Sequence, residues 1–335
     1  MGGNRLSYKD SFPETQHFFD LVKKNGENTN IRQLKIDKDN ILIDSKEILS
    51  YIKDFYSKLY SKRDTEQPKE WIKILHDKKL IPQISEEDIR QLNRDISKEE
   101  IEKVQKSFQN NKAPGSDGLT HEFYSHFWVD IVEFLMASYE ESMKEGELST
   151  LQRQNMIRLI PKKDKDRLEL KNWRPLNLIE YDTKLIAKVY AWRMIEVLGK
   201  IIHIDQTAYV RGRFIGEGIR TIEGVIEFLK SNELEGYLLS VDFEKAFDSL
   251  DWEFLWESMR AFGFPNDFID KIKILYTKIE ARVINNGTTT DAFEIARGTM
   301  QGFPIAGFLF IVAVELLFIK LRNEEEIQGI RIGQK

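Results

Sequence analysis

An acidic residue at the end of an apolar run is the first candidate for chemistry in this sequence. Residues 237–243 read as a buried strand, and Asp242 lies where that strand should give way to a turn. A carboxylate there can bind a hard cation such as Mg²⁺, which prefers oxygen ligands. Asp248 follows in the same segment and could cap the next helix or interact with its dipole. The spacing alone leaves two interpretations of Asp242, a metal ligand or a residue that closes a turn.

The second candidate is the polar segment at residues 297–304, which precedes an apolar run. Gly302 lets the backbone approach a ligand closely, and Pro304 suits the first turn of a helix. The Gln301 side chain offers hydrogen-bond donors as well as an acceptor. These residues could line a ligand site, although Gly-x-Pro before a helix is also common in proteins without one.

Basic residues gather in two places, although the whole chain has a formal charge of −5. Residues 153–174 hold eight basic and three acidic side chains, so this stretch carries a charge of +5. Such a stretch could hold a triphosphate or a nucleic-acid backbone, and it could equally be a solvated loop. Arg211 and Arg213 lie near Tyr209 and Phe214, a mixture that suits phosphate contact combined with base stacking.

The elements that must position these residues alternate between helix and strand. Apolar spacing predicts a strand at residues 156–160, helices at 183–198 and 216–230, and hairpins at 35–43 and 282–295. Hairpins make at least part of the sheet antiparallel. The sequence therefore predicts the α+β fold class.

The N-terminal third is expected to be mostly helical. Ser45 is predicted to cap one helix, and Ser85 and Ser97 each begin a capping-box pattern before another. A dense polar loop at residues 110–118 then precedes one long predicted helix across residues 123–135. No catalytic pattern is visible before this loop.

Length and composition set broader limits. A chain of 335 residues predicts two or three lobes, and 41% hydrophobic residues exclude global disorder. The absence of cysteine excludes a disulfide partner, a thiol nucleophile and Cys-bearing zinc sites. Glu315 interrupts the apolar run at residues 303–319, which predicts a buried core helix and no membrane span.

Taken in order, these segments resemble the reverse transcriptases of non-LTR retrotransposons, the long interspersed element class. The resemblance covers residues from about 97 to 335, with weaker similarity from about 30 to 60. Four motifs carry it: Lys112-Ala113-Pro114-Gly115-Ser116-Asp117-Gly118-Leu119-Thr120; Leu159-Ile160-Pro161-Lys162 with Asn172-Trp173-Arg174-Pro175-Leu176-Asn177-Leu178; Val241-Asp242-Phe243-Glu244-Lys245-Ala246-Phe247-Asp248; and Arg297-Gly298-Thr299-Met300-Gln301-Gly302-Phe303-Pro304. Asp205-Gln206-Thr207-Ala208-Tyr209 also fits the family.

The resemblance implies an α+β right-hand polymerase. Residues 1–96 would be a helical N-terminal linker or extension, residues 97–235 the fingers with their N-terminal extension, and residues 236–335 a partial palm. The implied activity is RNA-directed DNA polymerisation in the nucleus or the cytoplasm. It would use an RNA template, a DNA primer, dNTPs and two Mg²⁺ ions.

The resemblance also implies a role for each site residue. Asp242 would bind both metal ions with help from the Phe243 carbonyl. The backbone amides near Lys245 and Ala246 would hold the triphosphate, and the ring of Phe247 would exclude a 2′-hydroxyl.

The remaining implied roles concern the phosphates and the template. Lys162 and Arg174 would neutralise the β- and γ-phosphates. Gln301 and Gly302 would line the nascent base pair and the template. The basic and aromatic cluster that contains Arg211 and Arg213 would contact nucleic acid.

The sequence departs from the family in two respects. The family often has Gly-x-Pro-x-Ser-Pro where this chain has Ala306 and Gly307 in the last two positions. A palm Asp-Asp pair is also expected shortly after residues 329–333, and no Asp-Asp dipeptide occurs up to Lys335. One carboxylate holds two dications poorly, so we expect this chain to be truncated, without a thumb, and inactive by itself.

Two other interpretations stay open. The missing Asp-Asp pair and the +5 stretch favour a non-catalytic nucleic-acid-binding remnant of a retroelement. A mobile-intron maturase would share part of the pattern, but residues 242–247 and the fingers extension favour the non-LTR class.

Overall fold

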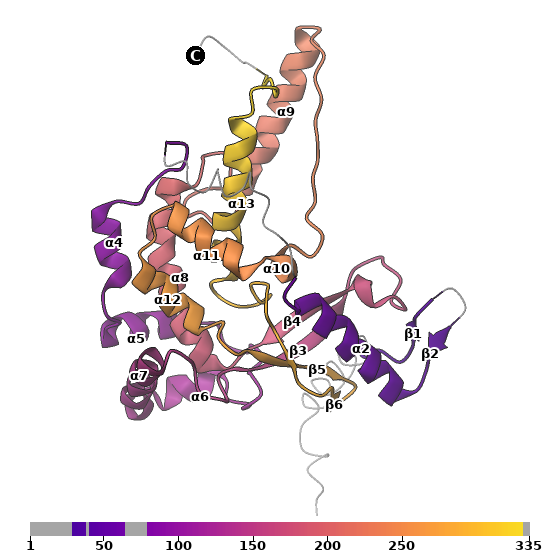
Figure 1. The fold of residues 1–335 in the computed structure, drawn as a ribbon, viewed down its shortest axis with the longest axis vertical. Coiled ribbons are helices and arrows are strands. Elements are labelled where there is room, and N and C mark those ends of the chain that lie inside the picture. The colour runs from indigo at the N-terminus through magenta and orange to yellow at the C-terminus, as the bar shows by residue number, and fades with distance from the viewer. Residues whose placement is uncertain (1–28, 38–39, 64–78, 331–335) are drawn as a thin grey trace, which may run out of the picture.

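The computed structural model describes residues 29–37, 40–63 and 79–330, and it combines helices with a mixed sheet. Figure 1 shows most helices gathered around α8 on one side and the sheet with α2 on the other. The helices are α2 (Ser45–Tyr60), α4 (Glu86–Asn93), α5 (Lys98–Lys106), α6 (His121–His126), α7 (Trp128–Glu145), η1 (Leu170–Asn172), α8 (Tyr181–Ile201), α9 (Ile215–Ser231), α10 (Ala246–Ser249), α11 (Trp252–Ala261), α12 (Asn266–Ile274) and α13 (Ala306–Arg322). The strands are β1 (Leu34–Lys35), β2 (Ile41–Leu42), β3 (Gln154–Pro161), β4 (Trp173–Leu178), β5 (Glu280–Asn285), β6 (Thr288–Thr289) and β7 (Phe293–Glu294). This content confirms the predicted mixture of helix and strand.

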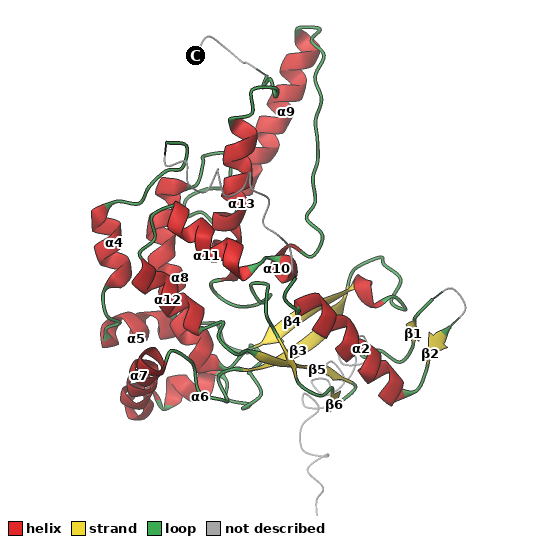
Figure 2. Cartoon of the chain, in the orientation of Figure 1, coloured by secondary structure: helices red, strands yellow, loops and turns green. Residues whose placement is uncertain are grey.

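The main sheet has the strand order β4-β3-β5-β6, and β7 also pairs with β5. β3 is antiparallel to β4 and parallel to β5, whereas β6 and β7 are antiparallel to β5. Both predicted hairpins are therefore present, as β1–β2 and as β5 with β6 and β7; the turn residues 38–39 of the first lie outside the described residues. Figure 2 shows the yellow strands in the lower centre, with the helices beside them.

The register of β3 and β4 sets the position of the basic residues. Ile160 lies opposite Arg174, and β4 alternates between buried and exposed residues at its start. Arg174 is exposed between the buried residues Trp173 and Pro175, because successive side chains of a strand point to opposite faces. Lys162 follows β3 directly, so both cationic side chains lie at the same end of the strand pair.

The helical side is built on α8 and α13. Most of α8 is buried, and it packs against α4, α5 and α13. α13 also packs against α10 and α11, and it contains most of the apolar run at residues 303–319, as predicted for a core helix. Among the helices of the described ranges, none is long and apolar enough to cross a bilayer.

Helix α2 joins the N-terminal region to the site. Asp44, and not the predicted Ser45, caps it: the Asp44 carboxylate accepts from the backbone amides of Lys46 at 2.8 Å and Glu47 at 3.1 Å. Asp and Ser are equally good caps, so the sequence did not separate the two positions. The buried stripe of α2 faces β5, β7 and α10. This stripe consists of Ile48, Ile52, Tyr56 and Tyr60.

The single long helix predicted across residues 123–135 is wrong. The chain forms α6 and α7, separated at Phe127, whose φ of −99° and ψ of 17° leave the helical range. The Phe127 carbonyl accepts from the amide of Ile131 and so begins α7. The apolar spacing continues through this break, which is why the sequence pattern read as one helix.

The buried strand predicted at residues 237–243 is also wrong. The segment has no regular structure, and its side chains are exposed, with Tyr237 98% and Leu239 84% exposed. Figure 2 shows it as a long green stretch beside α9. A strand needs a neighbouring strand to satisfy its backbone groups, and no strand of the described residues pairs with this one.

Candidate functional site

Three separate segments of the sequence line one pocket of about 310 Å³. They are the β3–β4 connection with the start of β4, the turn at residues 242–248, and Gln301. The lining residues are Lys162, Lys171, Trp173, Arg174, Pro175, Asp242, Phe243, Glu244, Lys245, Ala246, Phe247, Asp248 and Gln301. Every residue predicted to bind nucleotide or metal lines this pocket except Gly302, which follows Gln301 in the chain. The fold thus brings together residues that are far apart in the sequence.

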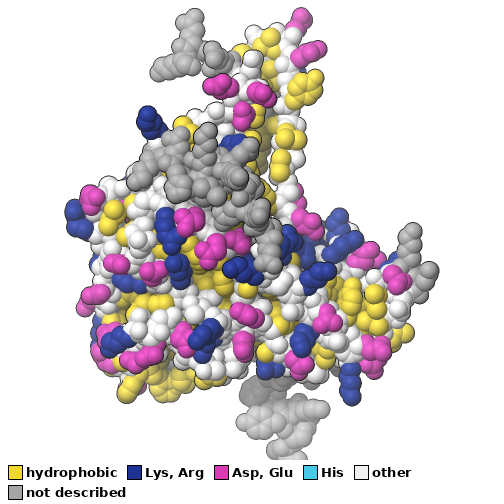
Figure 3. All heavy atoms as spheres, in the orientation of Figure 1, with side chains coloured by type: hydrophobic (Ala, Val, Ile, Leu, Met, Phe, Trp, Pro, Cys, Tyr) yellow, Lys and Arg dark blue, Asp and Glu magenta, His cyan; other side chains and the backbone are white. Residues whose placement is uncertain are grey.

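The pocket is mixed in charge with an excess of cations. Its basic side chains are Lys162, Lys171, Arg174 and Lys245, and its acidic side chains are Asp242, Glu244 and Asp248. In the space-filling view, several Lys and Arg side chains gather where α10 lies next to the loop between β3 and β4 (Figure 3). Cations held side by side on a pocket wall suit a polyanion such as a triphosphate.

The 242–248 turn places Asp242 at the surface and Asp248 inside. Asp242 is exposed, whereas Asp248 is 6% exposed. Between them Lys245 has a φ of 50°, in the left-handed region that costs energy for a residue with a side chain. The Lys245 ammonium lies 4.2 Å from the centre of the Phe55 ring on α2, and burial lowers its pKa against the opposing charges of Asp248 and Glu244.

The carboxylate of Asp248 has a specific donor. The hydroxyl of Tyr60, the last residue of α2, donates to it at 2.8 Å. Burial raises the pKa of Asp248; the bond from Tyr60 and the charges of Lys245, Lys162 and Arg297 oppose that shift. Asp248 is not the cap of α10, because Lys245 holds that position; Asp248 lies in the first turn of this helix, where the alternative interpretation as a helix-dipole partner places it.

The 297–302 turn is held from two sides. The amide of Thr299 donates to the carbonyl of Phe247 at 2.7 Å, which joins this turn to the 242–248 turn. On the other side the amide of Asn177 in β4 donates to the carbonyl of Gln301 at 2.9 Å. Gly302 has a φ of 103°, and a Cβ there would lie 3.2 Å from the Asn177 carbonyl oxygen, so a residue without a side chain suits this position.

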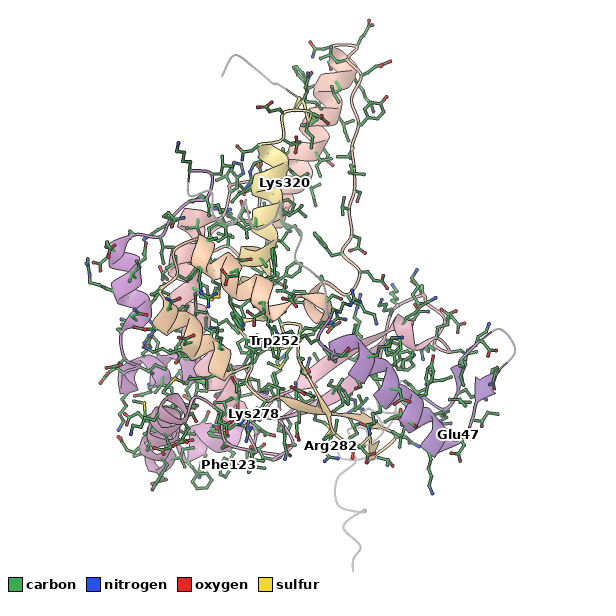
Figure 4. All side chains as sticks on the ribbon, viewed as in Figure 1. Glu47, Phe123, Trp252, Lys278, Arg282 and Lys320 are labelled. Carbon is green, nitrogen blue, oxygen red and sulfur yellow. The ribbon has the colours of Figure 1, made fainter. Side chains whose placement is uncertain are left out.

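A tryptophan adds a further restraint on the 297–302 turn. The indole N–H of Trp252 donates to the carbonyl of Gly298 at 2.7 Å. Figure 4 labels Trp252 at the start of α11, close to α10. Gly298 has a φ of 88°, and a Cβ there would lie 3.0 Å from the carbonyl oxygens of Phe247 and Asp248. The two turns therefore approach each other as backbone against backbone.

The Phe247 ring belongs to an aromatic group beside the pocket. Its centroid lies 5.0 Å from that of Phe310 and 6.5 Å from that of Tyr209. A Cβ at Gly307 would lie 2.3 Å from the Tyr209 ring, so the glycine at this position leaves room for the tyrosine. The departure from the family's Ser-Pro ending at Ala306 and Gly307 thus coincides with a close aromatic contact.

Arg211 and Arg213 lie in a different groove, which is lined by residues of α4, α5, α8 and the segment 207–213. Arg211 forms an ion pair with Glu196 at 2.5 Å. Arg213 donates to the carbonyl of Ile202 at the end of α8 at 2.9 Å and to that of Gln206 in the following loop at 2.8 Å. These bonds stabilise the end of the helix. Contact of either arginine with nucleic acid stays a prediction.

The carboxylates that the pocket offers to a cation lie within residues 242–248. Within the described ranges, no three or more His, Cys, Asp or Glu side chains are placed so that they could hold a metal ion together. Asp242 and the Phe243 carbonyl offer a partial set of oxygen ligands, and the Asp248 carboxylate is already bonded to Tyr60.

Two features of the pocket were missed by the sequence. Lys171 lines the wall next to Arg174. It belongs to the +5 stretch, but nothing in the sequence distinguished it from the other basic residues there. Nothing in the sequence indicated Tyr60, because a tyrosine on the apolar stripe of a helix is expected to be a core residue. Its partner Asp248 is also 188 residues away in the sequence.

The chain is similar to known proteins of one family. A family model for reverse transcriptase (RNA-dependent DNA polymerase) matches residues 160–331. A 149 kDa protein of transposon TX1 from Xenopus laevis is 32% identical over 309 residues, which is 92% of this chain and 23% of that protein. The Pol polyprotein of the type-2 retrotransposable element R2DM from Drosophila melanogaster is 32% identical over 97 residues, 29% of this chain and 9% of its own.

A further relative covers much of the chain at lower identity. The Pol polyprotein of a type-1 retrotransposable element R2 from Nasonia vitripennis is 24% identical over 246 residues, 73% of this chain and 23% of its own. The chain spans less than a quarter of the length of these three relatives. The family generally uses divalent metal ions. The matching family model and these relatives show that the chain belongs to the reverse transcriptase family, in the class of the non-LTR retrotransposons.

Proposed function

We propose that this chain is the fingers and part of the palm of an RNA-directed DNA polymerase. The enzyme would extend a DNA primer along an RNA template with dNTPs. Residues 97–235 would form the fingers with their N-terminal extension, residues 236–335 the partial palm, and residues 1–96 the linker that precedes them. The observation that supports this most directly is the pocket in which Asp242, Arg174 and Gln301 meet. A nucleotide there would contact all three segments at once.

The residues of the pocket suit distinct tasks in holding a nucleotide. Lys162 and Arg174 would bind the β- and γ-phosphates from the β3–β4 side. The backbone of Lys245 and Ala246 would contact the triphosphate from the opposite wall. The Phe247 ring, fixed by Phe310, would leave no room for a 2′-hydroxyl.

The base and the template would lie over the 297–302 turn. Gln301 lines the pocket, and its carbonyl is held by Asn177. Gly302 beside it presents backbone without a side chain, which permits close approach of a base pair. Both residues are fixed before a nucleotide binds, because β4 and the 242–248 turn hold the segment from two sides.

We propose Mg²⁺ as the cation of the intact enzyme, with Asp242 and the Phe243 carbonyl as two of its ligands. Oxygen ligands and retained waters suit this ion. The remaining carboxylates would come from a palm Asp-Asp pair in a longer chain. The 335 residues without such a pair are expected to show no primer extension.

The test is primer extension on an RNA template by a longer chain, in which these residues are followed by an Asp-Asp hairpin and a thumb. The longer chain should extend the primer, and Asp242→Asn should abolish extension because one anionic oxygen is lost. Glu244→Gln is the matched control, since it removes a charge from the same pocket without touching the proposed ligands. Extension by the Asp242→Asn protein, or none by the unaltered longer chain, would contradict the proposal.

A second candidate function is nucleic-acid binding without catalysis. The +5 stretch and the second groove with Arg211 favour it. Binding of the 335-residue chain to an RNA/DNA hybrid should weaken as salt rises, because each phosphate contact releases counterions. Arg211→Gln should lower the salt slope by about one.

The control for this test is Arg90→Gln. Arg90 on α4 is exposed and paired with Glu87, much as Arg211 is paired with Glu196, but it lies outside the groove. The Arg90→Gln variant should leave the salt dependence of binding unchanged. Equal slopes for both variants and the unaltered chain would remove Arg211 from the interface.

A further inference from the structure

The end of α2 contacts both turns of the pocket. The Tyr60 hydroxyl donates to Asp248 in the 242–248 turn at 2.8 Å. The Tyr60 carbonyl accepts from the amide of Ala296 at 2.9 Å, and the Leu59 carbonyl accepts from the guanidinium Nε of Arg297 at 2.6 Å. α2 lies outside residues 160–331 that the family model matches. The helix that precedes the fingers is thus bonded to both walls of the site.

The Tyr60–Asp248 bond is formed away from water. Tyr60 is fully buried, and Asp248 is 6% exposed. A buried carboxylate that loses a donor keeps its desolvation cost without compensation. Lys245, Lys162 and Arg297 act on Asp248 through their charge, and Tyr60 is the side chain that fixes the direction of the carboxylate by a hydrogen bond.

Asp248 is placed to transmit this restraint to the nucleotide contacts. It lies on the single turn of α10, next to Phe247 and two residues after Ala246. Its backbone amide donates to the Lys245 carbonyl at 2.9 Å, a bond that begins α10 directly after the left-handed residue Lys245. The orientation of Asp248 therefore fixes the residues that would face the triphosphate and the sugar.

We infer that Tyr60 is a positioning residue for nucleotide binding, and that α2 holds the 242–248 turn in its binding geometry through the Tyr60–Asp248 hydrogen bond. This inference rests on the proposed polymerase function for its consequence in catalysis. The structural link itself, between α2 and the turn, can be measured without any activity.

Tyr56 provides a matched control on the same helix. Its ring lies parallel to that of Tyr60, with centroids 6.3 Å apart and an interplanar angle of 24°. Tyr56 is as deeply buried as Tyr60, but within the described residues its hydroxyl has no hydrogen-bond partner. Tyr56→Phe and Tyr60→Phe remove the same atom from the same helix, and only the second breaks a bond.

The first experiment measures amide hydrogen exchange of the 335-residue chain. Tyr60→Phe should speed exchange across residues 245–249 by about tenfold, the effect of one lost bond to a charged acceptor. Tyr56→Phe should leave these rates unchanged, and exchange in α8 should be the same in all three proteins. Equal rates at residues 245–249 in the unaltered and Tyr60→Phe chains would overturn the inference, as would equal acceleration by both variants.

The second experiment uses the longer chain with its Asp-Asp pair and thumb. Tyr60→Phe should raise the KM for dNTPs about tenfold, change kcat less, and leave the affinity for primer–template unchanged. A protein with a lower melting temperature but an unchanged KM would show that Tyr60 serves stability alone. If the unaltered longer chain does not extend a primer, the proposed function fails, whereas the exchange rates still decide whether Tyr60 fixes the turn.

Discussion

Glu180 shows how one carboxylate can hold a motif loop. It is 2% exposed and accepts from the amide of Ser116 at 2.8 Å, the hydroxyl of Ser116 at 2.5 Å and the amide of Asp117 at 3.3 Å. Gly115 permits this approach, because a Cβ there would lie 2.7 Å from the Cα of Glu180. The loop that resembles the family's fingers extension is therefore attached directly to the start of α8.

The raised pKa of Glu180 determines how this residue changes the stability of the chain with pH. Burial raises the pKa of Glu180 from 4.5 to about 7, so the folded chain binds this proton more tightly than the unfolded chain. Its contribution to stability is full below about pH 4.5 and is lost as the pH rises to about 7. Relative to Glu180→Gln, the unaltered chain should therefore lose stability across this interval.

Urea denaturation from pH 4 to pH 8 measures the difference between the two proteins. Asp182 and Asp248, whose pKa values are also raised by burial, are present in both and cancel in the difference. Parallel pH profiles would show that the pKa of Glu180 is the same in the folded and the unfolded chain.

At the scale of elements, Arg193 joins α8 to the helices before it. Its guanidinium forms two bonds to the Glu100 carboxylate, at 2.9 and 2.6 Å. It also donates to the carbonyls of Leu92 at 3.0 Å, Arg94 at 2.6 Å and Asp95 at 3.1 Å. The segment between α4 and α5 is thus fixed on α8 by one buried cation.

Arg193→Met should lower the free energy of unfolding by about 3–5 kcal/mol, because three backbone carbonyls lose their donor and the Glu100 carboxylate keeps only its exposed partner Arg94. Arg94→Met is the matched control: Arg94 contacts the same carboxylate at 2.9 Å from an exposed position and should cost less than about 1 kcal/mol. Chemical denaturation of both variants measures the comparison. Equal losses of unfolding free energy would mean that burial does not determine how much this ion pair contributes to stability.

At the scale of the whole molecule, α9 and the segment after it form an apolar surface that the rest of the described chain leaves exposed. No residue of α9 is buried, and one face of it presents isoleucines at helical spacing. These are Ile215, Ile219, Ile222 and Ile226. Residues 237–243 run beside this helix (Figure 1), and their apolar side chains are exposed. Apolar patches of this kind on a protein surface usually mark a contact with another segment or molecule.

We expect a longer chain to cover residues 237–243 by pairing a strand with them. In the 335-residue chain the amides of this segment should exchange at nearly the rate of an unstructured peptide. When the segment is followed by an Asp-Asp hairpin, exchange should slow by several orders of magnitude, while exchange in α8 stays constant. Rapid exchange in the longer chain would mean that the hairpin packs elsewhere.

The sequence by itself determined most local structure, because the signals lie within a few residues of each other. Ser85 and Ser97 cap α4 and α5 as expected, and the hairpin at β5 followed from alternation around a tight turn. The order of the motifs also identified the family and predicted the members of the pocket. Each of these inferences depends on short-range patterns or on the chemical type of a residue.

Only the tertiary structure decided how the pocket is held and which segments lack a partner. Tyr60 meets Asp248 across 188 positions of sequence, and Arg213 turns its donors to the end of α8. Residues 237–243 carry the pattern of a strand and form none, since a strand requires a neighbour that their own side chains cannot supply. Contacts between distant segments depend on the packing of the whole chain, and no local pattern encodes them.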